Sequence, residues 1–126
     1  MSATPLHTAV CEPRRSTTTR APLLILLHGY GSDEADLLGL ADHLDPRFRL
    51  VSARAPLPLD MGGHAWFPIE FTVAGLAVDY EAGERAMDQL GRLLTQLQEV
   101  SGNDAGDTFV LGFSQGGAMA LGLLLA

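Results

Sequence analysis

Hydrophobic residues along this chain fall into short continuous runs and longer helical stripes, which together predict alternating strands and helices. The runs at residues 22–27, 48–53 and 108–111 are mostly apolar, which is typical of strands buried on both faces of a parallel sheet. Helical stripes lie between them and after the last run. The alternation predicts an α/β fold with a mostly parallel sheet and helices on both faces, in a single domain over residues 1–126.

Two of the predicted helices carry clear boundary signals. In the first, Ser32 stands as an N-cap before acidic residues, apolar residues recur over 37–44, and Pro46 ends the pattern. The second covers residues 79–100, with alanines and leucines on one stripe, and residues 101–103 (Ser-Gly-Asn) terminate it. A third helix is predicted from Ala118 onwards by its alanine- and leucine-rich composition.

The N-terminal residues are weakly patterned. Residues 6–10 and 17–20 are consistent with two short antiparallel strands joined by a turn at 12–16. The alternative is a transit peptide, because this segment contains Arg and Thr and has a single acid, Glu12, before Asp33.

A long connection at residues 56–78 separates the second strand from the second helix. It is apolar, and it brings Trp66, Phe67 and Phe71 close together in the sequence. Connections of this length in compact domains are usually functional or mobile. We expect this one to pack against the domain, because a large apolar segment is unfavourable in water.

The last residues form an apolar run, Leu-Gly-Leu-Leu-Leu-Ala, with no polar residue or glycine cap after it. From this pattern we expect the chain to be a fragment of a longer protein, truncated after the third helix. The alternative is a genuine short protein that buries this helix in a partner.

Composition excludes several classes of function. The net charge is −7, and all eight basic residues are Arg, so the chain is a poor candidate for binding nucleic acid or anionic membranes. No apolar run approaches the roughly 18 residues of a membrane span.

Cys11 is the one cysteine, which excludes an intrachain disulfide and suits a reducing, cytoplasmic location. Four scattered histidines and the absence of Lys indicate neither a metal site nor a phosphate loop, so no cofactor is expected.

The candidate chemistry centres on residues 112–116, Gly-Phe-Ser-Gln-Gly. A G-x-S-x-G sequence between a strand and a helix is the signature of a nucleophile elbow, in which a strained turn presents the serine hydroxyl. Side chains two residues before or after the serine would collide with each other or with the neighbouring strand, so glycine is needed at both positions. We interpret Ser114 as a nucleophile; the alternative is a glycine-rich turn with an incidental serine.

A second motif, His28-Gly-Tyr-Gly31, follows the first predicted strand. Elbow enzymes stabilise the oxyanion with the N–H after the nucleophile and an N–H from such a loop. Those donors are here Gln115 and Tyr30. The carboxyl ends of parallel strands meet at one edge of a sheet, so the two motifs should converge.

No general base is evident. Elbow enzymes order their triad as serine, then acid, then histidine, yet residues 115–126 contain no Asp, Glu or His. His28 is expected to shape the oxyanion loop, and His43 to be solvated on its helix. His64, in the long connection, is the remaining upstream candidate. Without a base, the 126 residues alone should be close to inactive, on the order of 10⁶-fold below a complete triad.

Four motifs in order resemble the phospholipase/carboxylesterase family: residues 27–40, 52–56 (Ser-Ala-Arg-Ala-Pro), 62–67 (Gly-Gly-His-Ala-Trp-Phe) and 112–120. This family comprises serine α/β-hydrolases, including acyl-protein thioesterases and bacterial carboxylesterases. The resemblance covers the chain from about Leu23 onwards and implies an α/β-hydrolase fold. Members continue for roughly another 80–100 residues that carry the catalytic Asp and His, which this chain lacks.

By this resemblance the catalytic groups are the Ser114 hydroxyl and the amides of Tyr30 and Gln115. It also implies that His28, Gly29 and Gly31 shape the substrate site and that Trp66 and Phe67 line the acyl site; the alternative for the two aromatics is ordinary loop anchoring. The implied activity is hydrolysis of carboxylic esters or thioesters with short to medium acyl chains through an acyl-serine intermediate. The expected partner is a small-molecule or lipid ester substrate. A homodimer is a further expectation. The alternative function is a non-catalytic chain that acts as an interaction module.

Overall fold

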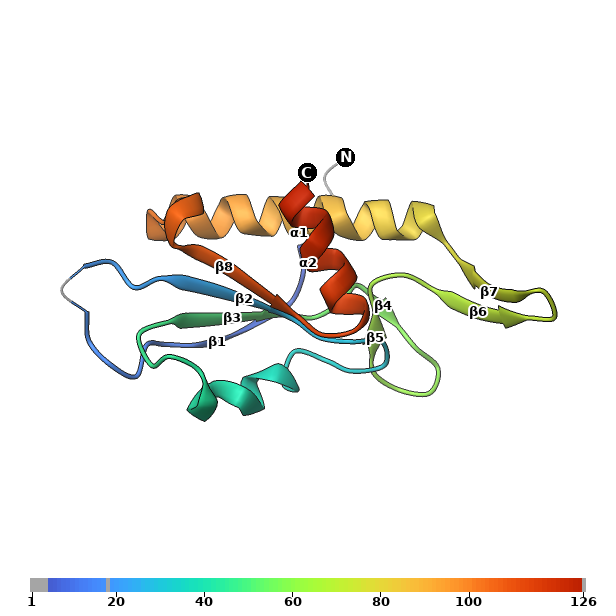
Figure 1. Cartoon of the computed structure of the whole chain (residues 1–126), viewed down its shortest axis with the longest axis horizontal. Helices are drawn as coiled ribbons and strands as arrows, with labels where there is room; N and C mark the ends of the chain where they lie inside the picture. The colour runs from blue at the N-terminus through green and yellow to red at the C-terminus, as the bar shows by residue number, and fades with distance from the viewer. Residues whose placement is uncertain (1–4, 18, 126) are drawn as a thin grey trace.

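A four-stranded sheet forms the centre of the molecule, and its strand order places β2 between two parallel neighbours. The computed structural model describes residues 5–17 and 19–125. The strands are β1 (Thr8–Cys11), β2 (Leu23–Leu27), β3 (Arg49–Ala53) and β8 (Thr108–Gly112), in the order β1-β3-β2-β8 (Figure 1). β2 runs parallel to β3 and to β8, whereas β1 is antiparallel to β3.

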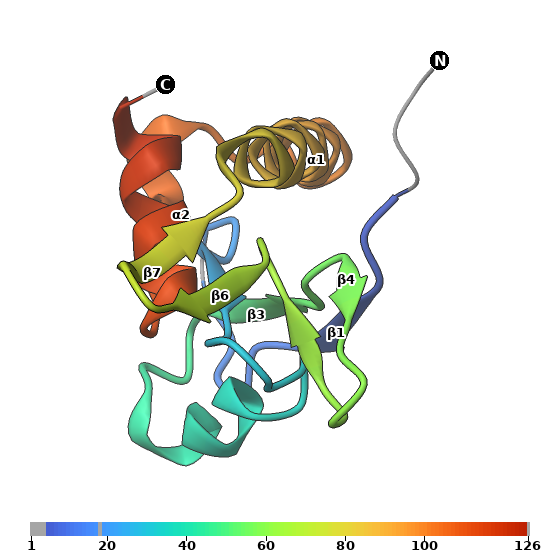
Figure 2. The same ribbon diagram turned by 90° about the vertical axis from the view of Figure 1, so that its right-hand side faces the viewer.

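Helices cover both faces of the sheet, as predicted. α1 (Tyr80–Ser101) and α2 (Gln115–Leu125) lie on one face, and the 3₁₀ helix η1 (Leu37–His43) lies on the other (Figures 1 and 2). All five residues of β2 are buried, because alternate side chains enter different cores. Leu23, Ile25 and Leu27 pack with the helices α1 and α2, and Leu24 and Leu26 pack with Leu37 of η1.

α1 confirms the predicted amphipathic helix nearly to the residue. The carboxylate of Asp79 accepts a hydrogen bond from the Ala82 amide (3.1 Å) and caps the first turn. Gly102 ends the helix in a left-handed conformation, with φ 79°. Ala82, Ala86 and Leu90 are its buried residues. α2 begins at Gln115, three residues earlier than the sequence predicted.

The predicted N-terminal pair of strands is wrong. β1 covers residues 8–11 and pairs with β3 across the sheet, with Val10 opposite Val51. Thr17, Thr19 and Arg20 are not in a strand, and Thr18 lies outside the described residues. β1 instead satisfies the edge of β3, which would otherwise present unpaired backbone groups.

The predicted helix after the first motif is also different in kind. It is a 3₁₀ helix that begins at Leu37, and Ser32 is not its N-cap. The Asp33 carboxylate accepts from the Ala35 amide (2.9 Å), and the Ser32 hydroxyl donates to Asp36 (2.8 Å). These local bonds hold residues 32–36 as a turn, which competes with a first helical turn.

The long connection contains two hairpins rather than irregular loop. β4 (Leu57–Pro58) pairs with β5 (His64–Ala65), and β6 (Ile69–Thr72) pairs with β7 (Gly75–Val78). The second hairpin projects from the body of the molecule (Figure 1). The expectation that the whole connection packs inward is therefore wrong for Phe71, which is 89% exposed, although Trp66 is completely buried.

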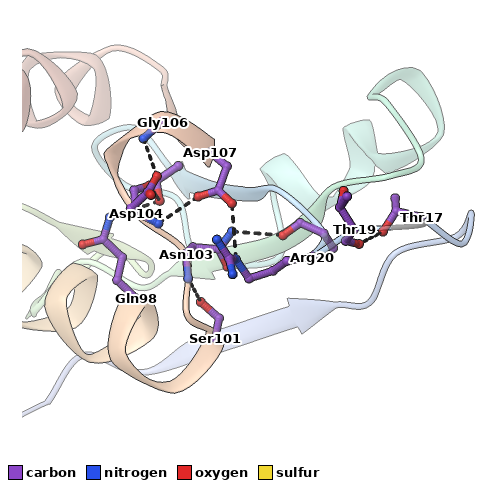
Figure 3. A network of polar contacts seen from close by, with 11 residues as sticks. Thr17, Thr19, Arg20, Gln98, Ser101, Asn103, Asp104, Gly106 and Asp107 are labelled. Atoms are coloured by element: carbon purple, nitrogen blue, oxygen red, sulfur yellow. Dashed lines mark hydrogen bonds and ion pairs between the residues drawn. The ribbon is translucent and has the colours of Figure 1, made fainter.

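A polar network joins the segments that precede β2 and β8, at the amino ends of these strands. Asp104 and Asp107 form a capping box around the short 3₁₀ helix η2 (Ala105–Asp107). Arg20 pairs with Asp107 (3.4 Å), and the Asn103 side chain donates to the Ala21 carbonyl (3.1 Å) (Figure 3). This network aligns the two strands at the end opposite the loops that contain His28 and Ser114.

Candidate active site

The site is built where β2, β3 and β8 end together. In the sheet register, Leu27 lies opposite both Ala53 and Gly112. The next residue after β2 is His28, and Ser114 follows two residues after β8. Because β2 and β8 are adjacent parallel strands, the loops that follow them start side by side. The Phe113 amide donates to the Leu27 carbonyl (3.1 Å) and continues this pairing into the elbow.

Ser114 occupies a strained turn between β8 and α2. Its φ is +56°, and it is the one non-glycine residue with a positive φ in the part of the chain that the structure describes. An L-residue in this region carries a steric penalty of about 1–2 kcal/mol. The side chain is exposed. The Ser114 carbonyl accepts from the amides of Gly117 (2.9 Å) and Ala118 (3.2 Å), which holds the turn against relaxation.

Glycine is required on both sides of Ser114, as the sequence predicted. A Cβ at Gly112 would overlap the Gly116 carbonyl, and a Cβ at Gly116 would overlap the Leu27 carbonyl. In both cases the obstacle is backbone, which cannot rotate away as a side chain can. The close approach of α2 to β8 and β2 therefore depends on these two residues.

The predicted oxyanion loop contacts the elbow. A Cβ at Gly29 would stand 3.3 Å from the Ser114 Cβ and 3.3 Å from the Phe113 carbonyl oxygen, so the backbone of the loop passes directly beside the serine. Among the described residues, no partner accepts a hydrogen bond from the Tyr30 amide or the Gln115 amide. The two amides that the sequence selected as oxyanion donors thus remain available.

His28 has a structural role in this arrangement. It is completely buried, and its Nε2 accepts from the Ala55 amide (2.9 Å) while Nδ1 lies 2.7 Å from the Gly29 carbonyl. These partners require the neutral tautomer with its proton on Nδ1. Burial lowers the pKa of His28 below its ordinary value of 6.5. The occupied Nε2 leaves His28 no lone pair with which to deprotonate Ser114.

A hairpin from the long connection supports the predicted oxyanion loop from the other side. The Gly31 amide donates to the His64 carbonyl (2.9 Å), and the His64 amide donates to the Ser32 carbonyl (2.8 Å). Gly31 has φ 82°, and a Cβ on Gly63 would overlap the Gly31 carbonyl. His64 therefore anchors the loop through its backbone. Its buried Nδ1 has no hydrogen-bond partner among the described residues.

Trp66 and Phe67 lie beside the elbow rather than in a separate loop. The Trp66 indole Nε1 donates to the His28 carbonyl (2.8 Å), and its ring centroid is 5.6 Å from that of His28. Phe67 helps to line a cavity of about 330 Å³ together with Val78, Tyr80, Met87 and Met119. The indole of Trp66 is thus an anchor, whereas the Phe67 side chain faces a cavity between the hairpin and the helices.

Sequence reasoning missed two features of this region. One is the side chain of Gln115, which is buried and bonded to the segment at residues 66–67. The other is an ion pair between buried Glu34 and Arg54 (2.6 Å), which His7 joins at 3.3 Å. The Arg54 guanidinium, hydrogen-bonded to Glu34, lowers the pKa of that carboxyl. In both features the interacting residues are far apart in the sequence. No local sequence signal could therefore have predicted either one.

Among the described residues, the structure places no general base against Ser114. Within residues 5–17 and 19–125, no hydrogen bond links the Ser114 hydroxyl to a histidine. His43 is exposed on η1, and His7 pairs with Glu34. The described residues also contain no cluster of His, Cys, Asp and Glu able to hold a metal ion. None of the helices described is long and apolar enough to cross a membrane.

Comparison with known proteins gives matches for both the sequence and the fold. The sequence model of the Phospholipase/Carboxylesterase family matches residues 7–126. Esterase PE8 is 30% identical with a TM-score of 0.76, and the match covers 95% of this chain and 57% of that protein. A carboxylesterase from Mesorhizobium loti has a TM-score of 0.78 at 22% identity, covering 95% of this chain and 54% of its own.

An acyl-protein thioesterase 2 from Zea mays shares the fold at a TM-score of 0.66 and 24% identity, with 93% of this chain and 50% of that one covered. The chain thus spans about half the length of these solved structures, from 50% to 57%. Its mixed sheet with helices on both faces is the corresponding part of an α/β-hydrolase fold. On the match over residues 7–126, together with the elbow and its adjoining loop, the chain belongs to the phospholipase/carboxylesterase family.

Proposed function

We propose that Ser114 is the nucleophile of a carboxylic ester or thioester hydrolase and that the reaction passes through an acyl-serine intermediate. The serine Oγ would attack the substrate carbonyl carbon, and its proton would pass to a base. The alkoxide or thiolate leaving group would depart with a proton, and water would then hydrolyse the acyl-serine bond. No cofactor enters this sequence.

The observation that supports the proposal most is the strained turn at Ser114. A φ of +56° is maintained between two glycines whose replacement would bring Cβ atoms into the backbone. Such strain is costly and is retained mainly at functional sites. The turn presents an exposed hydroxyl at the start of α2, where the helix dipole favours developing negative charge.

We propose that the amides of Tyr30 and Gln115 form the oxyanion hole. Both are free of other acceptors in the described part of the chain, and Gly29 brings the Tyr30 loop against Ser114. Removing one such donor typically lowers turnover about 10²–10³-fold. His28 and Gly31 would hold the loop in shape through their bonds to Ala55 and His64.

For the acyl group we propose a wall formed by Phe67, which the completely buried Trp66 beside it holds in place. Phe67 faces an apolar cavity of about 330 Å³ beside α2, which suits a short to medium acyl chain. The substrate would be a small-molecule or lipid ester. The acidic net charge of −7 argues against nucleic acid as a partner. We also propose a cytoplasmic location. A homodimer is compatible with this function.

The test is hydrolysis of p-nitrophenyl butyrate by the protein made from its complete reading frame, with Ser114→Ala as the control. We expect activity that is lost in Ser114→Ala and a covalent adduct on Ser114 after treatment with a fluorophosphonate. Activity that survives Ser114→Ala would reject the assigned nucleophile. We further propose that residues 1–126 alone do not turn over the ester, because no base is hydrogen-bonded to Ser114 within residues 5–17 and 19–125.

A non-catalytic role is the second candidate, and the end of α2 favours it. Leu121, Leu124 and Leu125 are 61%, 79% and 84% exposed, and we propose that this end of the helix would then serve as a docking surface. An intact protein that folds, shows no hydrolysis of p-nitrophenyl butyrate and gives no fluorophosphonate adduct would support this role instead.

A further inference from the structure

The side chain of Gln115 joins the nucleophile elbow to the Trp66–Phe67 segment. Its Oε1 accepts from the Trp66 amide (2.8 Å), and its Nε2 donates to the Phe67 carbonyl (2.8 Å). Only 6% of Gln115 is exposed. Two good bonds from one buried carboxamide to consecutive residues resemble the pairing of a strand edge, and they fix both the position and the orientation of the segment.

Trp66 extends this connection to the oxyanion loop. Its indole Nε1 donates to the His28 carbonyl, two residues before Tyr30. The elbow, the aromatic segment and the oxyanion loop are therefore linked by side chains that are all buried. Removing a buried partner leaves the remaining groups unsatisfied, so such links break at a high cost.

We propose that Gln115, through its side chain, is a positioning residue that holds the Trp66–Phe67 segment and its own backbone amide in one rigid arrangement. The catalytic consequence of this proposal rests on the proposed function of Ser114. The hydrogen-bonded link itself does not depend on that function. The oxyanion donor at residue 115 and the acyl wall at residue 67 would then be set by one side chain. Correct placement of such groups within about 1 Å can be worth roughly 10²-fold in rate.

The chemistry of the carboxamide explains why glutamine is needed. One end must accept from an N–H and the other must donate to a carbonyl. An ionised Glu at position 115 could still accept from Trp66, but its second oxygen would face the Phe67 carbonyl. A protonated Glu offers one acceptor and one donor and restores both bonds. Gln115→Glu should therefore behave as a pH-dependent version of the native link.

The first experiment uses the emission of Trp66, the one tryptophan in this sequence, isolated by subtracting the spectrum of a Trp66→Phe variant. In Gln115→Glu at pH about 8 we expect red-shifted emission and faster acrylamide quenching than in wild type. Lowering the pH to about 5 should restore the native signal, because burial raises the pKa of the new carboxyl. Wild type and Gln96→Glu, which alters an exposed glutamine of α1, should not show this recovery.

The second experiment separates binding from turnover in the protein made from its complete reading frame. Gln115→Met removes both hydrogen bonds at similar volume, and we expect kcat/KM for p-nitrophenyl esters to fall about 10–100-fold. The loss should appear in kcat as well as in KM. The kcat of Gln115→Glu, divided by that of wild type at the same pH, should rise as the pH is lowered. A purely structural role would reduce the amount of folded protein without changing kcat per folded molecule.

The outcomes distinguish this inference from the proposed function. Trp66 emission in Gln115→Glu that matches wild type at every pH would overturn the positioning role, whether or not the protein is an esterase. The expected emission changes without any hydrolase activity would reject the esterase and leave the link intact. If Gln115→Met does not fold, the pH-dependent recovery in Gln115→Glu decides the question.

Discussion

A Cβ atom at Gly116 would overlap the carbonyl oxygen of Leu27, so the first turn of α2 lies directly on the last residue of β2. This contact brings the serine turn and the oxyanion loop together, since Ser114 and His28 are the near neighbours of these two residues. The distance between two motifs about 80 residues apart in the sequence thus depends on the absence of one methyl group.

The first prediction tests that contact. Gly116→Ala should lower the free energy of unfolding by more than about 3 kcal/mol or prevent folding, because the obstacle is backbone. Gly91→Ala is the matched control on α1, since nothing lies within 4 Å of its Cβ position. It should raise stability by about 0.5–1 kcal/mol. Urea denaturation of both variants gives the comparison, and equal stabilities would contradict the close approach of α2 to β2.

The second prediction concerns strain at Ser114. Ser114→Gly should unfold with a free energy about 1 kcal/mol greater than Ser114→Ala, because glycine adopts φ +56° without the Cβ penalty. Both variants lack the hydroxyl, so they differ in the backbone penalty and not in the chemistry. Chemical denaturation monitored by circular dichroism measures the difference. An alanine variant as stable as the glycine variant would show that the turn is not strained.

The third prediction concerns pH. Burial lowers the pKa of His28, so below about pH 6.5 the unfolded chain binds a proton that the folded chain resists. The free energy of unfolding should therefore fall as the pH decreases from that value, by at most about 1.4 kcal/mol per pH unit.

The control for this effect is His28→Gln, whose side chain can still accept from the Ala55 amide. It should show a smaller dependence on pH over the same range. His43→Gln, which alters an exposed histidine on η1, should keep the wild-type slope. An unchanged slope in His28→Gln would mean that other groups cause the acid destabilisation.

The fourth prediction contrasts two aromatic residues of the long connection. Trp66→Ala should cost about 3–5 kcal/mol, since the indole is completely buried and bonded to the His28 carbonyl. Phe71→Ala should change stability by less than about 0.5 kcal/mol, because Phe71 is 89% exposed on the β6–β7 hairpin. Thermal unfolding of the two variants checks this, and similar losses would contradict the arrangement of the hairpin.

Local sequence determined the elements whose signals lie within a few residues. The run at 22–27 predicted a strand buried on both faces, and β2 confirms it. Asp79 and Gly102 bounded α1 because a cap acts on the amides and carbonyls of its own helix. Gly112 likewise reports a steric requirement of the immediate turn, because a Cβ there would meet the Gly116 carbonyl, so the elbow could be recognised from the sequence.

Tertiary structure decided everything that depends on which distant groups meet. The pairing of β1 with β3 and the exposure of Phe71 were not predictable, because strand partners and burial are set by the whole sheet and not by local pattern. For the same reason the sequence showed Gln115 only as a backbone donor. Its side chain acquired a role when the fold brought residues 66 and 67, nearly fifty positions away, within hydrogen-bonding distance.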